Sequence, residues 1–334
     1  MITFLTYDTN AGPLINLVRR TKKFLPHLRL RHRTYQKCFR NLSVPSGVLI
    51  FTDFDLLSDF EMEAAGSMAH AAEQSGKAVV LNHPAKIRER SSLLRHLHQT
   101  GLNSVEVSRL DSEIPTKFPV FIRLECGCEK PDTQLLNSLE EFNQAKSNLI
   151  DTGKPLAGRI ALSYEAAPDE QGFFRKYGAF RIGDHIVPQH LMLSKDWYVK
   201  GATVELNETQ KRETLNYVRD NPHRDRLMRY FDEAGHEFGR VDYTTRGNEI
   251  VLFEINSNPT FPNFTKWLRN GSERHKIMLD LLVKAFNGLP RLDGAGEIPF
   301  TLPKFLPKKV GRSRLGFFSY QKMKWKNILR KKNS

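Results

Sequence analysis

The chain has 334 residues, of which 40% are hydrophobic, and its formal net charge is +14 at pH 7. This length and composition predict a globular protein with two or three packed units. No run of about 18 apolar residues occurs, which argues against a transmembrane helix. The start at Met1 passes directly into a strand-like pattern rather than a signal peptide, so we expect a soluble cytoplasmic protein.

The positive charge is concentrated at the C-terminus. Eleven Lys or Arg residues and no acid follow Glu297. The rest of the chain is nearly balanced, so the charge alone does not predict a nucleic-acid partner, and no zinc knuckle, RNP motif or helix-turn-helix signature occurs. We expect residues 301–334 to form a basic tail. It is either solvated or packed on the body, or it is an amphipathic helix that binds an anionic membrane surface or an acidic partner.

The first third of the chain alternates strand and helix patterns. Strands are expected at 2–7, 47–52, 78–81 and 104–107, and helices at 13–24, 61–75 and 88–100. This alternation is typical of an α/β layer, and we place this first domain at residues 1–115.

Strand and hairpin patterns dominate the middle of the chain. Strands are expected at 117–123 and 159–166, and a hairpin with a Gly-Asp turn at 173–187. Residues 205–238 are expected to be largely helical, and a helix at 272–286 is expected to close the core. The second domain is therefore expected to span residues 116–300.

The most informative segment is a second hairpin, whose strands flank a turn at 245–248. Folding at this turn places Asp242 opposite Glu254. Because paired residues share a face, two carboxylates, an amide and a guanidinium point the same way, from Arg240, Asp242, Glu254 and Asn256. The other face is expected to carry Val241, Tyr243, Phe253 and Ile255.

An acidic hairpin face can simply be solvated. Residues 250–255 argue against this here, because they are nearly continuous apolar sequence, and a carboxylate inside such a run needs a partner. Carboxylate and amide oxygens suit Mg²⁺, especially where the ion also bridges phosphates. The hairpin therefore predicts a metal site.

Residues 239–259 resemble the metal-binding end of ATP-grasp enzymes, especially D-alanine:D-alanine ligases and ligases that glutamylate or condense amino acids. That family carries Arg-x-Asp, a turn, and then Glu-x-Asn with a nearby proline. The resemblance implies that Asp242, Glu254 and Asn256 hold one or two Mg²⁺ ions against the phosphates of ATP. It also implies that Arg240 steadies the acyl phosphate and the tetrahedral oxyanion.

Further segments in the same order strengthen the resemblance. The strand at 78–81, Asn82-His83-Pro84 and the basic helix after them resemble the pre-ATP-grasp domain of this superfamily. Arg123 ends a strand that in relatives commonly ends with a phosphate-gripping lysine, so the resemblance implies that Arg123 binds ATP. An ordinary edge strand with an exposed arginine is the alternative reading. Glu165 is implied as the acid near the ribose.

Two departures from the family pattern concern the phosphates. The loop at 125–130 has one glycine and two acids before its lysine, where relatives place a flexible glycine-rich loop. Gly178 stands where relatives often carry an arginine, so that role would pass to Arg175, Lys176 or Arg181. An exposed basic hairpin face remains the alternative for these residues. His190 has no neighbouring nucleophile or second metal ligand in the sequence and is assigned no catalytic role.

The resulting expectation is an α/β (α+β) chain with a pre-ATP-grasp domain, an ATP-grasp domain and a basic extension. The resemblance implies an ATP- and Mg²⁺-dependent ligase that joins a small carboxylate to an amine through an acyl phosphate. Two alternatives stay open. One is a degenerate ATP-grasp protein that binds a nucleotide without turnover, and the other is a protein that binds nucleic acid or an anionic surface through its tail.

Overall fold

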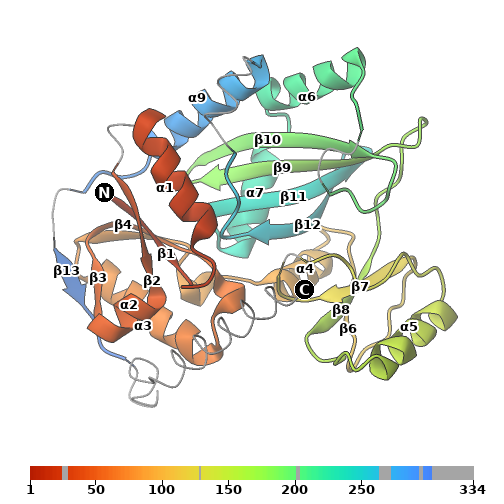
Figure 1. Cartoon of the computed structure of the whole chain (residues 1–334), viewed down its shortest axis with the longest axis horizontal. Helices are drawn as coiled ribbons and strands as arrows, with labels where there is room; N and C mark the ends of the chain where they lie inside the picture. The colour runs from red at the N-terminus through yellow and green to blue at the C-terminus, as the bar shows by residue number, and fades with distance from the viewer. Residues whose placement is uncertain (25–28, 128, 201–203, 263–271, 293–295, 303–334) are drawn as a thin grey trace, which may run out of the picture.

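The computed structural model describes residues 1–24, 29–127, 129–200, 204–262, 272–292 and 296–302. The chain builds an N-terminal α/β layer, a small three-stranded lobe and a larger antiparallel sheet (Figure 1). The expected mixed α/β class is confirmed. The proposed tail lies almost wholly outside the described residues. In the described part of the chain, no helix is both long and apolar enough to cross a membrane.

The N-terminal layer is a parallel sheet in the order β2-β1-β4-β5. Its strands are β1 (Ile2–Thr6), β2 (Leu30–Thr34), β4 (Gly47–Phe51) and β5 (Ala78–Leu81). Its helices are α1 (Gly12–Phe24), α2 (Tyr35–Asn41), α3 (Asp59–Gln74) and α4 (Arg90–Gln99), with short 3-10 turns η1 (Phe54–Leu56) and η2 (Pro84–Lys86). The alternation expected for residues 2–100 is confirmed, whereas β2 and α2 were not expected. The strand expected at 104–107 lies instead at 107–109 and belongs to a different sheet.

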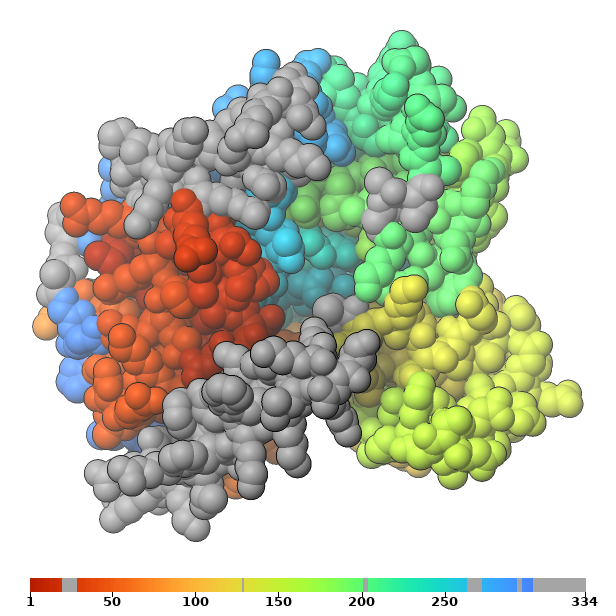
Figure 2. Space-filling model, viewed as in Figure 1, coloured from red at the N-terminus to blue at the C-terminus, as the bar shows by residue number. Residues whose placement is uncertain are grey.

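The small lobe is an antiparallel sheet in the order β6-β8-β7, covered by one helix. Its elements are β6 (Val107–Arg109), β7 (Val120–Leu124), α5 (Leu139–Asp151) and β8 (Arg159–Ser163). Val120 and Ile122 face the lobe's own core, so the alternating Phe121 and Arg123 face away from it. The space-filling view shows the lobe standing out at the lower right (Figure 2).

The domain boundaries expected near residues 115 and 300 do not coincide with the units into which the chain packs. A boundary at residue 115 divides the small lobe, because β6 precedes it and pairs with β8. Near the other boundary, β13 (Glu297–Pro299) pairs with β3 (Ser43–Pro45). The chain therefore returns to the N-terminal layer before residue 300, and the two domains share elements from distant parts of the sequence.

The larger sheet is antiparallel in the order β10-β9-β11-β12. Its strands are β9 (Phe174–Ile182), β10 (His185–Ser194), β11 (Phe238–Arg246) and β12 (Glu249–Asn256). Helices α6 (Glu208–Asp220), α7 (Arg224–Ala234) and α9 (Glu273–Asn287) cover one face (Figure 1). Tyr177, Ala179 and Val241 are buried in the core under these helices. The alternate residues point the other way, where Arg240 and Asp242 line a cavity and Phe238 packs on Phe4 of the N-terminal layer.

Asn82 ties the N-terminal layer to the larger sheet. Its backbone is left-handed, with φ of 57°. Its side-chain Nδ2 donates to the carbonyl oxygens of Phe51 and Phe238 at 2.9 and 2.8 Å, and its Oδ1 accepts from the Phe238 N–H at 2.9 Å. Because Asn82 is fully buried, all three hydrogen bonds are shielded from water.

Replacing Asn82 by Ala is expected to lower the free energy of unfolding by about 3 to 5 kcal/mol. The change leaves three buried backbone groups unpaired and puts a less tolerant residue in a left-handed conformation. Denaturant unfolding of the full chain measures the loss. Asn143→Ala, at an exposed position of α5, is the matched control and is expected to change stability little. Equal stability of the two variants would contradict this account.

Candidate active site

The hairpin of β11 and β12 has the expected register. Asp242 pairs with Glu254, and Arg240 pairs with Asn256. The pairing shifts between Asp242 and Tyr243, so Phe253 is an extra residue on β12. Phe253 consequently lines the same cavity as the two carboxylates. The expectation that it points to the opposite face is wrong, because strict alternation does not hold across a bulge.

A row of residues crosses all four strands beside the bulge. Gly178 on β9 pairs with His190 on β10 and with Asp242 on β11, and Asp242 pairs with Glu254 on β12. His190, Asp242 and Glu254 line a cavity of about 420 Å³ between the larger sheet and the small lobe. The row therefore brings together residues that are up to 76 positions apart in the chain.

Asp242 is a buried carboxylate with two cationic partners. The Arg240 Nε donates to its Oδ1 at 2.9 Å, and the Lys176 Nζ lies 3.3 Å from its Oδ2. Burial alone raises the pKa of Asp242, but the charges of Arg240 and Lys176 outweigh burial and hold the pKa below its usual range. Asp242 is therefore ionised at neutral pH.

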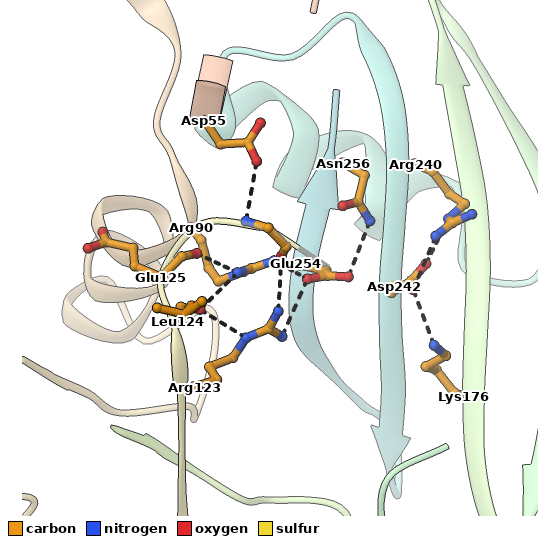
Figure 3. Close-up of polar contacts among 11 residues, drawn as sticks. Asp55, Arg90, Arg123, Leu124, Glu125, Lys176, Arg240, Asp242, Glu254 and Asn256 are labelled. Atoms are coloured by element: carbon orange, nitrogen blue, oxygen red, sulfur yellow. Dashed lines mark hydrogen bonds and ion pairs between the residues drawn. The ribbon is translucent and has the colours of Figure 1, made fainter. Parts of the chain in front are cut away.

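Glu254 lies beside Asp242 and contacts two arginines from other parts of the fold (Figure 3). Arg90 at the start of α4 forms an ion pair with its Oε2, and the Arg123 guanidinium lies 3.7 Å from the same atom. The Asn256 Nδ2 donates to the Glu254 Oε1 at 3.3 Å. Burial is the main cause that lowers the pKa of Arg123, and the positive charge of the nearby Arg90 lowers it further.

The same two arginines bind the loop that follows β7. Arg90 donates to the carbonyl oxygens of Glu125 and Gly127, and Arg123 donates to the Gly127 carbonyl oxygen at 3.2 Å. On the other side of the loop, the Asp55 carboxylate accepts from the Gly127 N–H at 3.4 Å (Figure 3). Sequence reasoning missed Arg90, whose only signal was its place in a basic helix.

The sequence suggested that Arg175, Lys176 or Arg181 takes the role of the arginine that relatives carry at the position of Gly178. Lys176 is the one that reaches Asp242. Arg175 lines the cavity, but its guanidinium is held by Asp169 and Glu213. The third, Arg181, forms an ion pair at 2.6 Å with Asp232 of α7, away from this cavity.

Glu165 is not among the residues that line the cavity. Its carboxylate accepts from Ser163 and lies 2.6 Å from the Lys117 Nζ and 2.9 Å from the Arg246 guanidinium. The residue implied as a ribose-binding acid is thus a buried carboxylate held by two half-exposed cations.

We call the row of Gly178, His190, Asp242 and Glu254 the carboxylate row. Its two carboxylates and the adjacent Asn256 are ligand types that suit a hard divalent cation. Two carboxylates and one amide oxygen meet on adjacent strands, and all three are the oxygen ligands that Mg²⁺ prefers. Among the described residues, no group of three His, Cys, Asp or Glu side chains gathers for metal binding. Asp242, Glu254 and Asn256 are thus of the ligand type that suits Mg²⁺, and in this structure both carboxylates are paired with Lys or Arg side chains.

The other end of the cavity is aromatic. Phe121 of β7 packs on Trp197 with ring centroids 5.2 Å apart, and Tyr164 meets the same indole edge-on at 5.3 Å. All three rings line the cavity, as does Met192. A flat apolar ring system therefore suits this end, while the row of charges suits a polyanion with its metal ion.

No family model matches the sequence, and no curated protein matches it. Several solved structures align with this chain over most of its length. The ATP-grasp ligase PsnB, complexed with a phosphomimetic variant of a minimal precursor, Mg and ADP, shows 10% identity and a TM-score of 0.49, covering 85% of this chain and 97% of that chain. The D-alanine–D-alanine ligase of Bacillus anthracis shows 9% identity and a TM-score of 0.47, covering 86% and 97%.

A third structure, the L-amino acid ligase of Bacillus licheniformis, shows 12% identity and a TM-score of 0.45, covering 90% of this chain and 78% of that chain.

Proposed function

We propose that this chain is an ATP- and Mg²⁺-dependent ligase that joins a carboxylate to an amine. The observation that carries the proposal is the carboxylate row, in which Asp242 and Glu254 meet cations from three other elements at one end of an aromatic-lined cavity. An ordinary ion-pair network does not require a cavity beside it. A nucleotide with its metal ion requires the cavity, the cations and the carboxylates together.

In the proposed reaction, the acidic and amide side chains would bind the metal ion and the cationic side chains would contact the phosphates. In such a ligation, the substrate carboxylate attacks the γ-phosphate of ATP, and an amine then displaces phosphate from the resulting acyl phosphate. Asp242, Glu254 and Asn256 would hold Mg²⁺, which when bound neutralises and aligns the phosphates. Arg123 and Lys176 would bind phosphate oxygens, and Arg240 would face the charge that develops during transfer. The chemistry requires no side-chain nucleophile.

The test is a screen for ADP release by the full chain with Mg·ATP and a panel of amino acids, peptides and small carboxylates, each with and without an added amine. Hydroxylamine in a parallel set converts an acyl phosphate into a hydroxamate, which reports the first half of the reaction without the natural amine. We expect ADP release that depends on one class of carboxylate. Mg·ATP binding without ADP release from any combination would contradict turnover.

One observation favours the alternative of nucleotide binding without turnover. Arg90 and Arg123 bind Glu254 and the loop carbonyls at the same time, so the loop is fastened over the carboxylate row. A ligand that reaches Glu254 must displace these contacts. Arg90→Ala separates the two cases. A ligase is expected to keep or raise its ADP release when the loop is freed, whereas a binding protein gains affinity for Mg·ATP and still releases no ADP.

A further inference from the structure

The segment that follows the last residue of β12 is held by the N-terminal layer. Asn256 ends β12, and its pairing with Arg240 of β11 is the last of the ladder. Strand ends fray unless other contacts fix them, so the place of the Asn256 side chain depends on what binds the residues after it. Asp53, two residues after the end of β4, contacts both Ser257 and Asn258.

Asp53 is a buried carboxylate that is paired without a cation. Only 1% of its surface is exposed, and it forms no ion pair with any described residue. Its Oδ2 accepts from the Tyr7 N–H at 2.9 Å, and its Oδ1 accepts from the side-chain amides of Asn10 and Asn258 at 2.6 and 2.7 Å. An ionised carboxylate can accept all three hydrogen bonds, whereas an amide of the same shape would turn its own N–H groups toward at least one of the donors.

The orientation of the Asn258 amide follows from its partners. Its Nδ2 lies 2.9 Å from the Asn10 carbonyl oxygen and 2.7 Å from the Asp53 Oδ1. A carbonyl oxygen can only accept, so the nitrogen must face it, because the reverse orientation would set oxygen against oxygen. The Asn258 Oδ1 has no partner among the described residues, so the side chain is held through its donor end.

The backbone of Asp53 contributes to the same junction. Its N–H donates to the Ser257 Oγ at 3.0 Å, so the N–H and the carboxylate of one residue bind two successive residues after β12. Asp53 has a left-handed backbone, with φ of 59° and ψ of 35°. Apart from glycine, Asn and Asp adopt this conformation most readily, and such residues cluster at functional sites, where surrounding contacts hold them in place.

We propose that Asp53 is a positioning residue for the metal site. By binding Ser257 and Asn258, it fixes the place of Asn256 beside Glu254, with which the Asn256 amide is in contact (Figure 3). The proposal rests on the proposed function, because Asn256 is one of the three ligands proposed for Mg²⁺. Asp53 is not among the residues that line the cavity, so it acts through Asn256 rather than on the nucleotide.

The experiment measures how much Mg²⁺ the full chain needs to bind ATP, before and after the substitution Asp53→Asn. ATP is titrated by calorimetry at a series of Mg²⁺ concentrations and in excess EDTA, at pH 8. Burial raises the pKa of Asp53 to about 6, so its carboxylate is ionised at this pH. Asparagine keeps the size of the side chain and tolerates the left-handed backbone, but it cannot accept all three hydrogen bonds.

We expect the Mg²⁺ concentration that gives half-maximal ATP binding to rise about tenfold to a hundredfold in Asp53→Asn, the usual effect of losing a group that orients a metal ligand. ATP binding in EDTA is expected to stay unchanged. Asn82→Ala is the matched control, because it weakens the same junction between layers at Phe238 rather than at the end of β12. It is expected to lose stability and keep the Mg²⁺ requirement of the wild type.

Ser257→Ala is a second route to the same test if Asp53→Asn fails to fold, because it removes only the acceptor of the Asp53 N–H. It is expected to raise the Mg²⁺ requirement by a smaller factor. A wild-type requirement in both variants would overturn the proposal, as would an equal rise in Asn82→Ala. These results leave the proposed function standing. Wild-type protein that binds ATP without needing Mg²⁺, or binds no ATP, would overturn the proposed metal site and this proposal with it.

Discussion

Glu254→Gln is expected to abolish Mg²⁺-dependent nucleotide binding, with a loss of about a hundredfold or more in affinity for Mg·ATP, while the fold stays intact. The substitution keeps the shape of the side chain and its contact with Asn256 but removes the charge that attracts a divalent cation. It also removes the partner of Arg90 and Arg123, so free ATP, which is an anion, is expected to bind no worse than before. Titrations of ATP with and without Mg²⁺ measure both effects.

The matched control is Glu249→Gln. Glu249 lies on the same strand, is exposed, and pairs only with Arg246 among the described residues. It is expected to leave Mg·ATP affinity unchanged. If Glu254→Gln binds Mg·ATP as tightly as the wild type does, the metal site is assigned to the wrong residues.

Arg240→Ala is expected to lower turnover by about a hundredfold or more with a small change in ATP affinity. Arg240 faces the row where charge develops, and removal of one such donor from a desolvated site typically costs two to three powers of ten in rate, about 3 to 4 kcal/mol. Arg123→Ala is expected to do the reverse, because Arg123 contacts the loop and Glu254 rather than Asp242. Steady-state kinetics with varied ATP separate the two effects.

Arg240→Lys is the control for charge alone. Lysine keeps the positive charge near Asp242 but cannot reproduce a planar two-pronged contact, so this variant is expected to recover only part of the rate. Melting temperatures of all three variants should remain close to that of the wild type. Equal losses in both kinetic parameters, together with lowered melting temperatures, would indicate a structural role for these arginines and contradict the division between them.

The hairpin itself could be predicted because a turn signal and the two-residue period of a strand are local information. The pairing next to the turn, Arg246 with Glu249, would by itself place Asp242 opposite Phe253, and the bulge is what brings Asp242 opposite Glu254. The expected elements of the N-terminal layer were correct for the same reason. Their apolar patterns are regular, whereas the capping box of Ser58 and Glu61, which starts α3 at Asp59, was not used in the prediction.

Bulges and long-range contacts could not be predicted from the sequence. Nothing in residues 249–256 shows that Phe253 breaks the alternation, and nothing in β10 shows that Gln189 does. Arg90 reaches Glu254 over 164 positions of sequence. β2 was missed because its sequence, Leu-Arg-His-Arg-Thr, is mostly basic, and its pairing with β1 supplies a strand that the apolar pattern does not predict.

The most direct test of the central claim is a calorimetric titration of ATP into the full-length wild-type chain, once with Mg²⁺ and once with excess EDTA. Because the proposal has Asp242 and Glu254, which pair across the hairpin on the cavity wall, hold Mg²⁺ against the phosphates, we expect tight binding that requires Mg²⁺. It also predicts one nucleotide per chain. Absence of ATP binding, or binding of equal strength in EDTA, would contradict the account.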